Sequence, residues 1–98
     1  MSKRKGLNEV TLFNFKKLVD DGNILHDSNF DNSKSNIEWL NSVSLLIGNL
    51  DSIFQSILVP IVDAAYLYRH DYDLCKKYMS DLVYSLDQIY GWMNNDDF

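Results

Sequence analysis

The sequence contains one cysteine, one proline and four widely spaced glycines in 98 residues. Cys75 has no second cysteine with which to form an internal disulfide, which is typical of proteins of the reducing cytoplasm. The glycines lie too far apart to form a phosphate-binding loop. No segment alternates apolar and polar residues over the length of a strand, so the sequence offers no evident source for a β-sheet.

An uninterrupted apolar segment of membrane-spanning length is also missing. The most apolar stretch, residues 45–62, is interrupted by Asp51 and Pro60, and a carboxylate inside a bilayer is costly. The basic residues Lys3, Arg4 and Lys5 are not followed by the apolar run of a signal peptide. We therefore expect a cytoplasmic protein with no membrane partner.

Basic residues are few, with nine Lys and Arg against 14 Asp and Glu, for a net charge of −5. Between residues 18 and 74, nine acidic residues stand against two basic ones, a balance of −7. Such a segment repels the phosphates of nucleic acid and attracts a basic protein surface. We expect no direct binding of nucleic acid.

The apolar content, 46% of residues with 13% aromatic, is ordinary for a globular protein and too high for a disordered one. The length suits one hydrophobic core. We predict a single helical domain over residues 1–98, with short flexible ends at 1–7 and 94–98.

The first predicted helix begins near Asn8 or Thr11, each of which can cap a helix, and ends at Asp21. Gly22 would take the left-handed position that follows a helix. Residues 22–35 are dense in Gly, Asn, Asp and Ser, which predicts a loop.

The second predicted helix is long and central. Ser35 and Glu38 match a capping box at its start. Seven apolar residues then follow at alternating spacings of three and four, which places them on one side of a helix: Leu40, Val43, Ile47, Leu50, Phe54, Ile57 and Ile61. We predict a helix over about 36–58 with a kink or break at Pro60, and we expect Leu50 and Phe54 to be almost fully buried.

Residues 61–69 are predicted to be helical, either as the continuation of the kinked helix or as a new helix, and a last helix capped by Asp71 or Asp73 follows. The last helix has its own apolar stripe: Cys75, Met79, Leu82, Leu86, Ile89 and Met93. The predicted fold class is all-α, a compact bundle of three to four helices.

Residues 64–82, AAYLYRHDYDLCKKYMSDL, resemble the turn between the paired helices of tetratricopeptide repeats. Ala64 and Ala65 are small, Tyr72 follows the turn, and Tyr78 lies at helical spacing after it. The resemblance covers about half of one repeat, and the sequence has no second copy. It implies a helical hairpin that packs in the same way, without the stack of repeats that a solenoid needs.

The strongest candidate for chemistry is the cluster of His70, Asp71, Asp73 and Cys75, which combines several types of metal ligand. No second ligand pair at zinc spacing accompanies it. We interpret the aspartates as helix caps and Cys75 as a small core residue. With only two histidines and no catalytic motif, we predict a protein that is not an enzyme and needs no cofactor or metal.

Two groups of residues are predicted to bind a partner protein. On a helical wheel Leu45 lies opposite the apolar stripe, beside the uncharged Asn49 and Ser52, and Tyr84 lies opposite the stripe of the last helix. Small uncharged residues allow another helix to approach, and exposed tyrosine is a favoured contact residue. The acidic group lies at a helix end and in a loop: Asp20, Asp21, Asp27 and Asp31.

The abundance of Asn, Asp, Lys, Ser, Ile and Tyr indicates AT-rich coding sequence, which is common for short acidic proteins of phages and other mobile elements. We therefore predict a protein that binds and neutralises a protein target, such as a basic nucleic-acid-binding enzyme. Anti-CRISPR proteins, antitoxins and immunity proteins are of this class. The alternative is a self-assembling structural or regulatory module, a helical homodimer without inhibitory activity.

Overall fold

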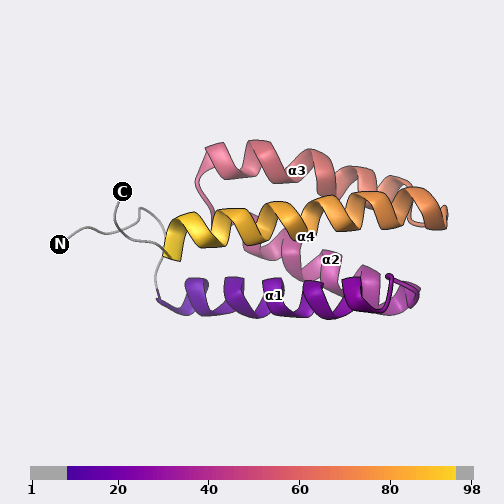
Figure 1. The fold of residues 1–98 in the computed structure, drawn as a ribbon. Helices are drawn as coiled ribbons and strands as arrows, with labels where there is room; N and C mark the ends of the chain where they lie inside the picture. Colours follow the sequence, from indigo (N-terminus) through magenta and orange to yellow (C-terminus); the bar gives the residue numbers. More distant parts are fainter. Residues whose placement is uncertain (1–8, 95–98) are drawn as a thin grey trace.

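The computed structural model describes residues 9–94, which form four helices and no strand (Figure 1). α1 spans Glu9–Asp27, α2 Ser33–Ile47, α3 Ser52–Leu67 and α4 Tyr72–Asn94. Successive helices run in opposite directions, so α1 begins and α4 ends at the same end of the bundle. The predicted all-α bundle is confirmed. The predicted ends, 1–7 and 94–98, lie outside the described residues except for Asn94, which ends α4.

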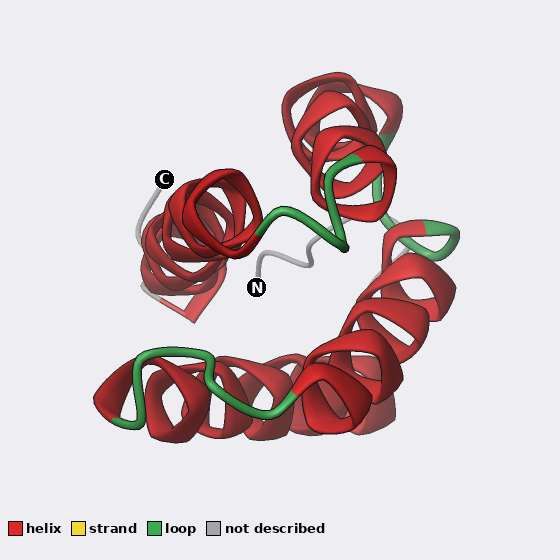
Figure 2. Ribbon diagram, turned by 90° about the vertical axis from the view of Figure 1, so that its right-hand side faces the viewer, coloured by secondary structure: helices red, strands yellow, loops and turns green. Residues whose placement is uncertain are grey.

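The four helices pack in a ring. α1 and α3 each pack against both α2 and α4, so that α1 and α3 lie diagonally across the bundle from each other. Figure 2 views this arrangement along the bundle. The centre of the ring is filled by fully buried side chains from every helix, among them Phe15, Leu40, Leu58, Met79, Leu82 and Leu86.

The apolar stripe of α4 is buried over its whole length, as predicted. Asp71 caps this helix, because its Oδ1 accepts a hydrogen bond from the backbone N–H of Leu74 at 3.2 Å. α3, the turn and α4 form the helical hairpin that the tetratricopeptide resemblance implies.

α1 does not end at Asp21. It continues through Gly22 to Asp27, so most of the predicted loop at 22–35 is helical. Gly22 is buried between α2 and α4, where its missing side chain leaves room for Trp39. The left-handed conformation that ends the helix is taken by Asn29 and Phe30, with φ of 59° and 53°.

The predicted capping box at Ser35 is also wrong. α2 begins one turn earlier, and Asn32 is its N-cap. The Oδ1 of Asn32 accepts a hydrogen bond from the backbone N–H of Ser35 at 3.0 Å. Asn and Ser can both cap a helix through a side-chain oxygen, so residue type alone does not show which of them is the N-cap. The point at which the chain enters the helix decides that it is Asn32.

The predicted long central helix over 36–58 is two helices. The chain leaves the helix after Ile47 and starts another at Ser52, after Asp51 in an extended conformation. The side chain of Gln55 donates a hydrogen bond to the backbone carbonyl of Ile47 at 2.9 Å, which satisfies one carbonyl at the end of α2. This turn lets α3 fold back against α2.

The break changes which residues of α3 face the core, because residues 48–51 do not advance the chain by regular helical steps. Leu50 is buried, as predicted, but Phe54 is only half-buried and Ile57 is 42% exposed. Leu58, Val62 and Ala65 occupy the core in their place.

Pro60 lies inside α3 without ending it. Proline cannot donate to the carbonyl four residues earlier, which belongs to Ser56. Both Pro60 and Ser56 are exposed, so the missing hydrogen bond lies on the solvent side of the helix. Packing of Leu58 and Val62 on the other side stabilises the helix despite the proline.

Within residues 9–94, none of the helices is long and apolar enough to span a membrane.

Candidate protein-binding surface

A groove runs along the outer side of the bundle between α1 and α2. Its volume is about 360 Å³. α1 contributes Thr11, Asn14, Lys17, Leu18 and Asp21, and α2 and the turn after it contribute Ser42, Leu45, Leu46 and Asn49. Leu46 is buried, whereas Leu45 is 77% exposed. The lining of the groove therefore combines apolar side chains, one of them highly exposed, with polar ones.

A second groove of about 310 Å³ continues the first toward the loop between α1 and α2, and the two share Leu18, Asp21 and Ser42. Trp39 lies in it, and its indole N–H donates a hydrogen bond to the backbone carbonyl of Leu18 at 2.9 Å. This hydrogen bond between the helices fixes the shape of the groove. Ile24, which also lines it, is 65% exposed.

Two of the four predicted acidic contact residues are neutralised by ion pairs within α1. Lys16 lies 2.9 Å from Asp20 and Lys17 lies 3.0 Å from Asp21. The hydrogen bond to Asp20, together with the charge of that carboxylate, raises the pKa of Lys16 above its ordinary value. The acidity of this part of the surface is therefore smaller than the residue count suggests.

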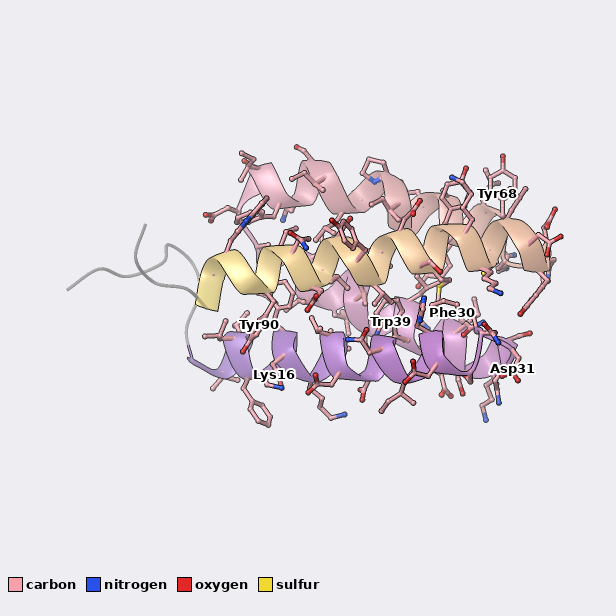
Figure 3. All side chains as sticks on the ribbon, in the orientation of Figure 1. Lys16, Phe30, Asp31, Trp39, Tyr68 and Tyr90 are labelled. Carbon is pink, nitrogen blue, oxygen red and sulfur yellow. The ribbon has the colours of Figure 1, made fainter. Side chains whose placement is uncertain are left out.

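The predicted partner-binding residues fall on different parts of the surface. Asp21, Leu45 and Asn49 line the first groove together. Asp27 is the last residue of α1. Asp31 lies at the same end of the bundle, at the α1–α2 loop, whereas Lys16, the partner of Asp20, lies toward the other end (Figure 3). Ser52 begins α3, and Tyr84 is exposed on α4. The helical wheel was right that Leu45 and Tyr84 point away from the core.

Sequence reasoning missed several exposed apolar residues. The predicted loop at 22–35 includes Ile24, although this residue lies three helical turns after Phe13 on the outer side of α1, where both are exposed. The larger omission is α3, which exposes Ile53, Ile57 and Leu67. The signal was available in the composition, because α3 has one charged residue, Asp63, in 16.

The predicted roles of the cluster at the α3–α4 turn match its geometry. Asp71 caps α4, and Cys75 is buried, which raises the pKa of its thiol above the ordinary value. Among residues 9–94, no three side chains of the types His, Cys, Asp and Glu lie together. The hydroxyl of Tyr72 donates a hydrogen bond to the backbone carbonyl of Asn29 at 2.7 Å, which ties this turn to the α1–α2 loop.

Comparison with known proteins finds no match to this chain among protein-family models, curated proteins or solved structures.

Proposed function

We propose that this protein acts by binding another protein, with the α1–α2 groove as the contact surface. The observation that carries the proposal is Leu45, an exposed leucine that lines a groove together with the apolar Leu18 and Leu46. Exposed leucines are common singly, but here Ile24 repeats the pattern in the adjoining groove. Apolar residues are thus available along the whole length of the surface.

The groove has the composition of a protein interface. Protein interfaces combine an apolar centre with hydrogen-bonding groups at the edge. Leu18, Leu45 and Leu46 supply the apolar part, and Asn14 and Asn49 supply side-chain amides. These amides can donate and accept hydrogen bonds to a partner's backbone.

The proposed partner is a protein with a basic surface, such as a nucleic-acid-binding enzyme, which this protein would inhibit by covering that surface. The net charge of −5 supports this partner. Charge of this sign accelerates the encounter with a basic protein, whereas desolvated apolar contacts slow dissociation. Because Asp21 is paired with Lys17 in the groove, the groove itself supplies the apolar contacts.

The first experiment places a photo-cross-linking amino acid at Leu45 in the native cell, with a matched variant at Gln88. Gln88 is exposed on α4 and lines neither groove. We expect the variant at Leu45 to form a covalent adduct with one protein, and the variant at Gln88 to form none with that protein. An adduct made only with a second copy of the chain would support the self-assembling alternative.

The second experiment measures binding kinetics with the protein identified in this way. Leu45→Asp should raise the dissociation rate, because it puts a charge into the apolar contact. Changing Asp20, Asp21, Asp27 and Asp31 together to Asn should lower the association rate, and added salt should lower it too. Kinetics indifferent to salt, to the four substitutions and to Leu45→Asp would overturn the proposal.

A further inference from the structure

The outer side of α3 carries an apolar stripe that is exposed to solvent at both of its ends. Ile53 is 65% exposed and Leu67 69% exposed. Ile57, Pro60 and Ala64 lie between them at spacings of four, three, four and three residues, which places all five on one side of the helix. An apolar side of a helix normally faces other protein and not solvent.

The stripe lies on the flank of α3 that faces away from α2. On the other flank, Gln55 reaches the end of α2, and the hydroxyl of Tyr66 is hydrogen-bonded to Asn41 of α2. A helical wheel places Ile57 and Ala64 on the side opposite Tyr66. The stripe therefore borders α4.

An exposed tryptophan of α4 extends the stripe. Tyr68 stacks on Tyr78, with ring centroids 5.7 Å apart, which sets the register of the two antiparallel helices. Ile53 precedes Tyr68 by 15 residues, and Trp92 follows Tyr78 by 14. Because both helices rise by the same amount per residue, Trp92 lies level with Ile53, and it is 53% exposed.

Charge at α3 opposes the association of two copies only weakly, because this helix has fewer charged residues than α1, α2 or α4. Two copies that each carry −5 repel each other over most of their surfaces. α3 contains one charged residue, Asp63, in 16. A basic partner, by contrast, would gain nothing from charge at this surface.

The stripe also matches itself under twofold symmetry. Its apolar positions are nearly symmetric about Pro60, with the large residues Ile53 and Leu67 at the two ends and the smaller Pro60 and Ala64 between them. In a twofold dimer each surface patch meets its own copy. Two antiparallel α3 helices would place Ile53 of one copy beside Leu67 of the other.

We infer that two copies of this chain associate through the outer sides of α3, with Trp92 of α4 at the edge of the interface. The stripe is about 21 Å long, from the helical rise over 14 residues, so we expect a weak dimer that dissociates on dilution. Because α1 and α3 lie on opposite sides of the bundle, the α1–α2 surface of each copy stays open in the dimer. The inference therefore does not depend on the proposed function.

The test is sedimentation velocity of the full chain over a series of concentrations. We expect the protein to shift from monomer to dimer as its concentration rises. Ile53→Asp and Leu67→Asp should each keep it monomeric at every concentration. Leu45→Asp is the matched control, since Leu45 is at least as exposed but lies on the α1–α2 side. Circular dichroism verifies that each variant is folded.

A disulfide experiment tests the antiparallel arrangement separately. In the variant with both Ile53→Cys and Leu67→Cys, oxidation should join two chains, because Cα atoms about 21 Å apart in one copy cannot be bridged internally. Ile53→Cys alone should give far less cross-linked dimer. A wild-type monomer at every concentration would overturn the inference, as would a dimer that Leu45→Asp dissociates while the two α3 substitutions leave it intact.

Discussion

Gly22 of α1 lies against the indole ring of Trp39 of α2, and the contact is too close for any side chain between them. A β-carbon placed on Gly22 would lie 2.6 Å from Cζ2 of Trp39 and 3.0 Å from Cγ2 of Val83. The same indole donates its N–H to the carbonyl of Leu18, one turn before Gly22. Gly22 thus sets the distance at which α1 packs between α2 and α4.

Gly22→Ala should lower the free energy of unfolding by about 1 to 3 kcal/mol, the usual cost of overpacking a core. The clash must outweigh the higher helix propensity of alanine, worth about 1 kcal/mol. Gly91→Ala is the matched control, because nothing lies within 4 Å of the β-carbon it would add to α4. It should raise the stability by up to about 1 kcal/mol. Urea unfolding measures both, and equal effects at the two glycines would contradict this account.

Leu58→Ala and Ile57→Ala, at adjacent positions of α3, should differ strongly in their effect. Leu58 is fully buried, so truncation should cost about 2 to 5 kcal/mol through lost burial and a cavity. Ile57 is 42% exposed, and its truncation should cost about 1 kcal/mol or less at monomeric concentrations. Denaturant unfolding compares them. A larger cost at Ile57 would mean that the apolar spacing of α2 continues through the turn.

Cys75 should react slowly with thiol reagents in the native state and rapidly after unfolding, because it is buried and its pKa is raised by desolvation.

The raised pKa of Cys75 means that the folded state keeps the thiol proton at a pH where the unfolded state loses it. Stability should therefore fall as the pH rises above the ordinary pKa of cysteine, about 8.5. Cys75→Ala should reduce this alkaline loss in a pH series of thermal unfolding, and an unchanged loss would assign it to another group.

Asp20→Asn and Asp21→Asn should leave the stability nearly unchanged, since both ion pairs on α1 are exposed and exposed pairs contribute little. Asp20→Asn should also lower the pKa of Lys16, because the hydrogen bond and the charge that contribute most to raising it are removed. NMR titration of the Lys16 side chain measures the change.

The sequence pattern predicted the buried residues most accurately in α4, a single regular helix with one apolar side. Every residue of the predicted α4 stripe is buried, from Cys75 to Met93, because a regular helix carries its spacing along its whole length. The pattern through α2 and α3 misled for the opposite reason. Spacings of three and four continue from Leu40 to Ile61 without interruption, yet the chain leaves the helix at Gly48 and the spacing after Ser52 belongs to a new helix.

The candidate surface was predicted only in part. The outward direction of Leu45 and Tyr84 follows from helical geometry alone. That Leu45 shares a groove with Asp21 depends on how α1 packs against α2, and local spacing contains no information on that contact. The ion pairs that neutralise Asp20 and Asp21 were within reach of the sequence, since Lys16 and Lys17 precede them by four residues.

The fold class, the apolar side of α4 and the outward position of Leu45 follow from sequence patterns, because these features depend on backbone periodicity and on the hydrophobic effect along one helix. Packing between the helices decided that Gly22 continues a helix and that residues 48–51 interrupt one. It also decided that α3 presents Ile53 and Leu67 to solvent. These features depend on contacts between residues distant in the sequence: the room that Trp39 needs beside Gly22, and the turn that brings α3 back against α2.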